Sequence, residues 1–384
     1  MFPKSIAHLR ARDDATNRRT FLKLAVGAGA GLALGAWLPG SADARGGSAD
    51  AAVFNPFVWI TPDNKVIVLS KHLDKGQGVA TGLATLVAEE LDASWDQIVA
   101  EFAPADVALY KNLAFGVQGT GGSTSIANAY EQYRRAGAAA RVMIVAAAAE
   151  RWGTAPERIT ISAGVVSDGK GSATLGELAV AAAKMPVPEL PKLKDAKDFV
   201  FIGKSFPRLD QKAKVAGKPI YTQDVRLPGM VVAVLARPVR FGGKVKSLDT
   251  GDTKKVNGVV EVVQVPQGVA VIADTTWAAI KGREALKIEW DESSAEKRGS
   301  EALLAEYRRL ATTPGAVARK DGDAEAALAR AAKVIEAEFA FPFLAHAPME
   351  PMNAVVEVKD GACTGWSGSQ MQTVDQGVTA AILG

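Results

Sequence analysis

The order of apolar and polar positions predicts alternating strands and helices in the first part of the chain. Residues 57–60 and 65–70 are short runs rich in β-branched and aromatic residues, and Pro62-Asp63-Asn64 separates them. Such runs around turn-forming residues predict a β-hairpin. An amphipathic helix is predicted next, from apolar residues at helical spacing: Val79, Leu83, Leu86, Val87 and Leu91. Glu89 and Glu90 fall off that stripe, and the Ala-rich stretch 130–152 predicts a second helix.

The rest of the chain follows a second mixed pattern after a Pro- and Lys-rich stretch that starts at residue 185. We interpret that stretch as a linker. Three strands (230–235, 259–265 and 268–273), a helix (276–286) and a short strand (287–290) are predicted beyond it. A charged, largely helical connector then spans 300–332. Strands are predicted at 334–339 and 353–358, the latter followed by a turn at Asp360-Gly361.

Composition indicates an ordinary globular protein. The 384 residues are 48% hydrophobic and 23% charged, enough for two or three domains. The formal net charge is +3, but residues 1–44 hold six Lys/Arg and three Asp/Glu, which leaves 39 of each sign in the remainder. That balance gives no support for a nucleic-acid-binding surface.

The N-terminus accounts for the excess positive charge. Basic residues up to Lys23 precede an uncharged apolar run over 24–38, and Ala42-Asp43-Ala44 follows. Arg18-Arg19 resembles a twin-arginine export motif, so we expect a signal over 1–44 and a periplasmic protein, either free or associated with the membrane. The alternative is a short membrane anchor, although about 15 apolar residues fall short of the roughly 20 that span a bilayer.

Cysteine and histidine usage limits the redox and metal chemistry of the chain. Cys363 is the single cysteine, so an internal disulfide or an iron–sulfur cluster within this chain is excluded. His8, His72 and His346 are too scattered in the sequence to suggest a zinc site. Any redox centre other than an organic or pterin cofactor must therefore lie on a partner chain.

Two glycine-rich turns carry the chemically suggestive pattern. Residues 74–78 (Asp-Lys-Gly-Gln-Gly) lie between a predicted strand and helix, and residues 118–125 (Gln-Gly-Thr-Gly-Gly-Ser-Thr-Ser) precede the next helix. Glycine permits close approach of the backbone, and a helix start carries partial positive charge, so such turns suit an anionic ligand. The alternative is a plain connection from strand to helix. Neither turn fits a P-loop or a dinucleotide fingerprint.

Several segments in one order resemble a known family. They are residues 70–78, 87–91, 119–123, 214–225 and 346–352. Together they are similar to the molybdopterin-binding subunits of the xanthine dehydrogenase and aldehyde oxidase superfamily, and within it to the isoquinoline oxidoreductase beta subunits. The resemblance covers nearly the whole chain after residue 44, in a permuted order relative to other members of the superfamily.

The resemblance implies an α+β, multi-domain fold with mixed sheets and packed helices. The expected parts are a signal (1–44), a permuted molybdopterin-binding segment (45–184), a linker (185–204), an α/β hammerhead domain (205–292), a connector (293–333) and the start of a further molybdopterin-binding domain (334–384).

It also implies a molybdenum hydroxylase that oxidises aldehydes or N-heterocycles with oxygen derived from water. The expected cofactor is molybdopterin cytosine dinucleotide with Mo. The expected partners are a 2Fe-2S small subunit, a cytochrome c subunit, a C-terminal Mo-domain fragment and a small-molecule substrate. The resemblance makes seven residues candidate contacts of the cofactor: Gly76, Gln77, Gly78, Gly121, Gly122, Ser123 and Gln370. In this assignment Gln77 donates side-chain hydrogen bonds, and Gln370 approaches the metal's oxo ligand.

Other residues have plainer interpretations. His346 and Glu350 are expected to hydrogen-bond backbone at a proline-rich bend, and His72 either faces the pterin or ends a strand. Trp59, Trp277 and Trp366 are expected in the core or at a sheet edge, and Cys363 as a small hydrophobe.

No catalytic residue is assigned, because the family's glutamate base and its Gly-Gly-Gly-Phe-Gly loop are expected beyond residue 384. We therefore expect an incomplete chain, which either results from truncation or gene splitting or is completed by a second polypeptide. The alternative is a noncatalytic remnant or assembly subunit.

Overall fold

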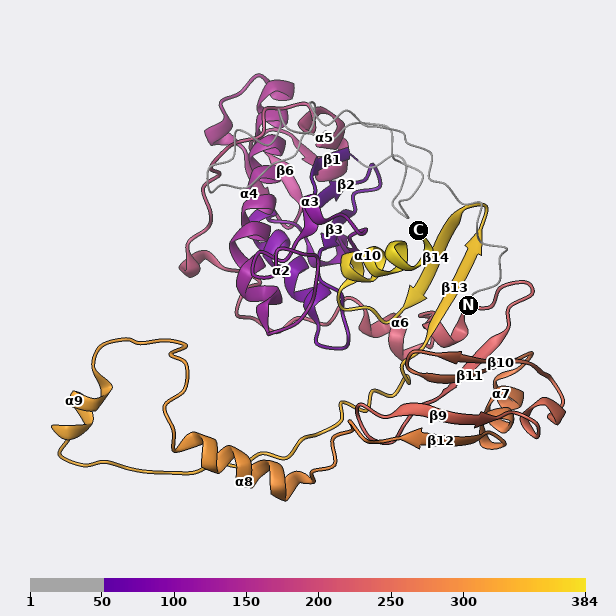
Figure 1. Ribbon diagram of the computed structural model, residues 1–384. Helices are drawn as coiled ribbons and strands as arrows, with labels where there is room; N and C mark the ends of the chain where they lie inside the picture. Colours follow the sequence, from indigo (N-terminus) through magenta and orange to yellow (C-terminus); the bar gives the residue numbers. More distant parts are fainter. Residues whose placement is uncertain (1–51) are drawn as a thin grey trace. The chain divides into compact units, whose positions relative to one another are not determined.

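The computed structural model describes residues 52–384, which form two compact units (Figure 1). The first unit contains the described residues up to Asp224 together with Met352–Gly384, and the second is Val225–Pro351. The predicted export signal over 1–44 and His8 lie outside the described residues. Helices and several sheets are present in the same chain, so the predicted α+β class is confirmed.

A four-stranded sheet forms the centre of the first unit. Its strands are β1 (Ala52–Asn55), β2 (Val58–Ile60), β3 (Val66–Ser70) and β4 (Ile98–Phe102), in that order. The predicted hairpin is confirmed, since β2 and β3 pair antiparallel with Trp59 opposite Ile67. All five residues of β3 are buried, which shows that both of its faces are covered.

Three helices pack on this sheet and on one another. The predicted helix over 79–91 is α2 (Val79–Leu91), which joins β3 to the parallel strand β4 as a crossover. The predicted Ala-rich helix is α4 (Thr124–Trp152), and it begins six residues earlier than expected. It packs along α2 and against α5 (Leu175–Ala182). The remaining elements are α3 (Val107–Tyr110), α6 (Gln211–Val215) and a small sheet of β5 (Thr160–Ser162), β6 (Val165–Ser167) and β7 (Ser172–Thr174).

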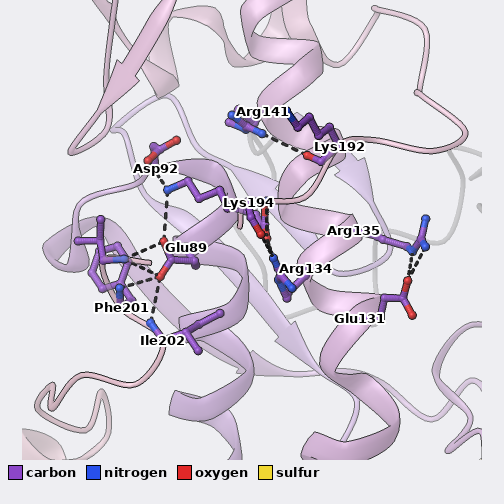
Figure 2. Close-up of polar contacts among 12 residues, drawn as sticks. Glu89, Asp92, Glu131, Arg134, Arg135, Arg141, Lys192, Lys194, Phe201 and Ile202 are labelled. Atoms are coloured by element: carbon purple, nitrogen blue, oxygen red, sulfur yellow. Dashed lines mark hydrogen bonds and ion pairs between the residues drawn. The ribbon is translucent and has the colours of Figure 1, made fainter. Parts of the chain in front are cut away.

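The charged end of α2 is buried, although its two glutamates fall off the apolar stripe of the helix. Glu89 and Glu90 both have no exposed surface, and Figure 2 shows Glu89 facing Phe201 and Ile202. They are covered by the segment 192–210, which we call the strap. Lys194 donates its backbone N–H to Glu90 at 3.0 Å, and Phe201 donates its own to Glu89 at 2.7 Å. Residues 192–204, interpreted from the sequence as linker, are therefore packed against α2 here.

The second unit contains the predicted strands and helix. A three-stranded sheet has the order β10 (Val259–Val265), β11 (Gly268–Ala273), β8 (Val232–Ala236), and α7 (Thr276–Glu284) packs on β8 and β11. The short predicted strand is β12 (Lys287–Asp291), which pairs with β9 (Lys244–Asp249). Strand β9 was not predicted, because most of its side chains are exposed and three of its residues are charged.

The connector is helical only in part. Helices α8 (Ser300–Ala311) and α9 (Ala324–Ala329) are separated by a stretch that contains Pro314 and two glycines, which interrupt helices. The predicted strand at 334–339 is wrong. It is irregular and exposed, with Ile335 81% and Phe339 77% accessible, because no described strand pairs with it.

The C-terminal part of the first unit is a hairpin followed by a helix. Strands β13 (Ala354–Lys359) and β14 (Ala362–Ser367) pair antiparallel around Asp360 and Gly361, as predicted. Helix α10 (Gln372–Leu383) follows, and a hollow of about 950 Å³ lies between it and the hairpin. Over residues 52–384, no helix combines the length and the apolar character needed to cross a bilayer.

Candidate functional site

The two glycine turns lie side by side in the fold. They are 74–78, before α2, and 118–123, before α4. Strand β3 leads into the first turn, and the residues after it bond to the second: His72 Nδ1 contacts the carbonyl oxygen of Gly119 at 3.0 Å, and the Leu73 N–H donates to Thr120 Oγ1 at 2.9 Å. Residues 47 apart in sequence are thus brought together at the N-terminal ends of two helices.

The first turn presents unpaired backbone N–H groups beside a helix start. Gly76 and Gly78 have φ angles of 102° and 86°, which favour glycine. Asp74 fixes the turn by accepting the Gly76 N–H at 2.7 Å. Within residues 52–384, no acceptor is found for the N–H groups of Gln77 and Gly78. This is the arrangement that binds anions at helix N-termini.

The Gln77 side chain is used inside its own turn. Its Oε1 accepts the Lys75 N–H at 2.6 Å, and its Nε2 donates to the Leu73 carbonyl at 3.0 Å. A second Nε2 hydrogen remains for another acceptor. Gln77 thus shapes the turn, and its direct contact with a cofactor stays a prediction.

The second turn is also open at a helix start. Gly122 and Ser123 have φ angles of 57° and 54° and are exposed. Among the described residues, the N–H groups of Gly121, Gly122 and Ser123 find no acceptor. The buried Asn112 supports the turn from the protein interior: its side-chain amide donates to the Gly119 carbonyl at 3.1 Å. Both turns therefore offer unpaired donors in neighbouring positions.

The structure joins Gln370 to the second turn across 250 residues of sequence. Its Nε2 donates to the Thr120 carbonyl at 2.9 Å, and the Thr120 N–H donates to the Gln370 carbonyl at 2.8 Å. The following Met371 occupies the space beside Gly119, where an added Cβ would lie 2.3 Å from its sulfur. All seven candidate residues therefore lie on the two turns or on the segment bonded to the second turn.

Two basic side chains, Lys71 and His72, are buried between the end of β3 and the first turn. Lys71 Nζ donates to Gln132 Oε1 at 2.6 Å and to the Lys111 carbonyl at 3.2 Å. No carboxylate within the described residues forms an ion pair with it. Burial lowers the pKa of Lys71 to about 8. A buried cation without a counter-charge favours an anion nearby.

His72 is neutral at pH 7 in this environment. Burial and the adjacent Lys71 ammonium lower the pKa of His72 to about 4, although the Gly119 contact and the nearby Asn128 side chain raise it. Its Nε2 is buried, and it makes no hydrogen bond of good geometry with Asn128. With Nδ1–H donating to Gly119, Nε2 carries a lone pair.

We expect His72 to make the fold sensitive to acid. Because its pKa is lower in the folded chain than the ordinary 6.5, the unfolded chain takes up a proton first as pH falls. Stability is fully present above pH 6.5 and is lost towards pH 4, by about 3 kcal/mol for this group. Urea unfolding between pH 7 and 5 should be less pH-dependent in His72→Gln. His346→Gln, at an exposed position, is the matched control, and equal slopes in the two variants would contradict the assignment.

The other singled-out side chains lie away from the turns. Trp59 is in the core of the first unit, whereas Trp277 is 66% exposed and packs under Lys281. His346 is exposed in the second unit, and Cys363 and Trp366 line the hollow beside α10. Among the described residues, no group of three or more His, Cys, Asp or Glu side chains could hold a metal ion.

Sequence reasoning missed Arg208, which contacts the first turn from the strap. Its Nη1 donates to the Gly76 carbonyl at 2.8 Å. Asn112 and Thr120, which support the second turn, were missed as well. The pattern around Arg208 gave no local signal, because its role depends on the path of the strap.

Comparison with known families gives two matches. A molybdopterin cofactor-binding domain model matches residues 4–225, more than half of the chain. A second model with the same description matches residues 310–384.

Individual relatives are similar over most of this chain. The isoquinoline 1-oxidoreductase subunit beta of Brevundimonas diminuta is 31% identical, over 96% of this chain and 53% of its own length. The membrane-bound aldehyde dehydrogenase [pyrroloquinoline-quinone] of Gluconacetobacter polyoxogenes is 30% identical, over 95% of this chain and 49% of its own length. The chain thus spans about half the length of these relatives. The crystal structure of quinoline 2-oxidoreductase from Pseudomonas putida 86 matches with 19% identity and a TM-score of 0.37, covering 47% of this chain and 28% of that one.

Proposed function

Because the chain belongs to the molybdopterin-binding large subunits of the xanthine dehydrogenase family, we propose that its two glycine turns form part of the pterin cofactor site of a molybdenum-dependent oxidoreductase. The observation that supports the site is the pairing of the turns. Unpaired N–H groups at the starts of α2 and α4 are held together by the His72–Gly119 and Leu73–Thr120 bonds. Such donors suit the phosphate-bearing tail of the cofactor.

The residues present fit an anionic group. Gln77 and Gly78 would donate from the first turn, and Gly121, Gly122 and Ser123 from the second. Gln370, fixed to Thr120, would present its amide beside the second turn without titrating. The buried Lys71, three residues before the first turn, adds positive charge to this part of the unit. When bound, the cofactor supplies the two-electron redox chemistry, which the polypeptide itself lacks.

The finer parts of the proposal follow from the relatives. Their names include an isoquinoline oxidoreductase and an aldehyde dehydrogenase, so the proposed substrates are aldehydes or N-heterocycles. Molybdopterin cytosine dinucleotide is the proposed cofactor form. A 2Fe-2S subunit and a cytochrome c are the proposed partners, since the single Cys363 cannot hold a cluster. The proposed location is the periplasm.

Metal and nucleotide content of the purified protein tests this proposal. The chain is produced with its neighbouring gene products in a host that makes the molybdenum cofactor, and the complex is analysed for Mo and for cytosine nucleotide released by acid. We expect close to one of each per chain. A complex that folds and carries neither Mo nor pterin would contradict the proposed function.

A variant of Gln370 tests the site itself. Gln370→Ala removes the donor to the Thr120 carbonyl and loosens the second turn, so Mo content or cofactor affinity should fall by up to about tenfold. Gln376→Ala, at an exposed position of α10, is the control and should match the parent. If both variants retained the cofactor equally well, Gln370 would not belong to the cofactor site.

A further inference from the structure

The strap contacts both ends of α2. It starts at the C-terminal end of the helix, where Lys194 and residues 200–202 bond to Glu90 and Glu89. Phe201 and Phe206 then stack with Trp95, at ring-centroid distances of 5.8 and 5.4 Å. It ends at the N-terminal end of the helix, where the Leu209 N–H donates to Thr81 Oγ1 at 3.1 Å. The first glycine turn therefore has the end of the strap beside it.

Arg208 connects the strap to that turn. Its Nη1 donates to the Gly76 carbonyl at 2.8 Å, and its Nη2 lies 3.6 Å from Asp74 Oδ1. The guanidinium also faces Gly78, where an added Cβ would lie 3.8 Å from its Cζ. One side chain thus contacts Asp74 and Gly76 and lies next to Gly78.

A carboxylate holds the guanidinium in place. Asp210 accepts from Arg208 Nε at 3.0 Å and from Nη2 at 2.8 Å, the bidentate geometry that orients arginine best. The hydrogen bond from Arg208 lowers the pKa of Asp210 to about 2, so the pair stays charged at neutral pH. Asp210 also pairs with Lys214, which adds a second cation to the cluster.

The donors of Arg208 are only partly used inside the protein. A guanidinium has five N–H groups, and three of them make the bonds to Asp210 and Gly76. The side chain is 37% exposed, next to the unpaired N–H groups of Gln77 and Gly78. The remaining hydrogens can therefore reach an anion that these backbone groups bind.

We propose that Arg208 is a positioning residue for the cofactor site: it holds the first glycine turn open from the strap and places a positive charge beside its unpaired N–H groups. The inference rests on the proposed function. Two glycines with positive φ have little intrinsic preference for one shape, so the turn needs external support. Asp74 and Gln77 provide it from within, and Arg208 provides it from the strap, 132 residues away in sequence.

The test measures how fast the loaded complex loses its cofactor. The parent, Arg208→Ala and Arg208→Lys are purified as complexes, and the Mo and pterin that remain are followed over time during buffer exchange at low and high salt. Loss from Arg208→Ala should be at least about tenfold faster than from the parent, as for other residues that orient a bound group from behind. Arg208→Lys keeps the positive charge but loses the planar guanidinium, so its rate of cofactor loss should lie between those of the parent and Arg208→Ala.

Salt separates a charge effect from a merely structural one. Added salt should speed cofactor loss in the parent and less so in Arg208→Ala, because part of the screened attraction is already missing. Arg240→Ala breaks an exposed Arg–Glu pair in the second unit and should behave as the parent does. Identical rates and salt dependence in Arg208→Ala and the parent would overturn the inference.

A second variant tests the same role in case Arg208→Ala does not fold. If Arg208→Ala cannot be isolated, Asp210→Asn keeps the arginine but weakens its orientation, and a two- to fivefold faster loss is expected. A rate equal to that of the parent would count against the role of Arg208. A folded parent complex that carries no cofactor would refute the proposed function, and this inference with it; a loaded parent with unaffected variants would refute the inference alone.

Discussion

Glu89→Ala is expected to lower the free energy of unfolding of the first unit by about 3–5 kcal/mol, the usual range for removing one partner of a buried charged network. The carboxylate is fully buried, and it accepts the backbone N–H groups of Val200, Phe201 and Ile202 at 2.7 to 3.0 Å and Lys194 Nζ at 3.2 Å (Figure 2). Alanine would leave the three backbone N–H groups without an acceptor, although Lys194 Nζ would keep its bond to Asp92, and the strap would lose its main anchor.

Urea unfolding followed by tryptophan fluorescence measures this effect, because Trp95 stacks on Phe201 of the strap. Glu131→Gln is the matched control. It removes an exposed glutamate that pairs with Arg135 on α4, and the change should stay within about 0.5 kcal/mol (Figure 2). Glu89→Gln keeps the shape of the side chain, so its loss of unfolding free energy should lie between those of Glu89→Ala and Glu131→Gln. A loss in Glu89→Ala no larger than in the control would contradict the anchoring role.

The same carboxylate has a defined pH dependence. Burial alone would raise the pKa of Glu89, but the hydrogen bonds from Ile202, Val200, Phe201 and Lys194 lower it below its ordinary value of 4.5. The contribution of Glu89 to stability is therefore fully present above pH 4.5 and is lost as pH falls below it. In Glu89→Gln this part of the acid sensitivity should be absent.

Gly137→Ala is expected to destabilise the first unit by about 2 kcal/mol or more, by overpacking the contact between α4 and α2. A Cβ at this position would lie 2.8 Å from the Val87 carbonyl oxygen and 3.1 Å from both the Val87 Cα and the Glu90 Cβ. Two of these atoms are backbone, so the helices would have to move apart. That cost exceeds the gain of about 1 kcal/mol that alanine brings to a helix interior.

A second helical glycine provides the control for this prediction. Gly377 lies in α10, and nothing is within 4 Å of a Cβ added there. Gly377→Ala should therefore leave stability unchanged or raise it by about 0.5–1 kcal/mol. Thermal and urea unfolding of the two variants compare them directly. If both variants changed the stability by the same amount, or if Gly137→Ala were stabilised, the helices would not be in close contact at this position.

The site could be predicted only in part. The sequence located both glycine turns at helix starts, and the fold places them side by side; their role in holding a cofactor stays a prediction. Gln370 was assigned through a family resemblance, and its paired bonds with Thr120 are visible only in the structure. Arg208 was not foreseen, because neither its neighbours nor its spacing relate it to Gly76.

The elements of the fold could likewise be predicted only where they depend on local sequence. The hairpin of β2 and β3, the helix α2 and the strands of the second unit follow from periodicity and turn residues, which act over a few positions. The strand expected at 334–339 is wrong, because a run of apolar residues becomes a strand only where another strand is available to pair with it.

By itself, the sequence determined the local features of this protein: where chain direction reverses, which stretches are helical, and where glycine allows a backbone N–H to be exposed. The tertiary structure alone decided that Glu89 and Glu90 are buried, that the Pro- and Lys-rich stretch becomes a strap, and that Arg208 reaches the first turn. The physical reason is distance along the chain. The donors that stabilise Glu89 lie more than 100 residues away, and no local pattern records which segment will cover a charged helix end.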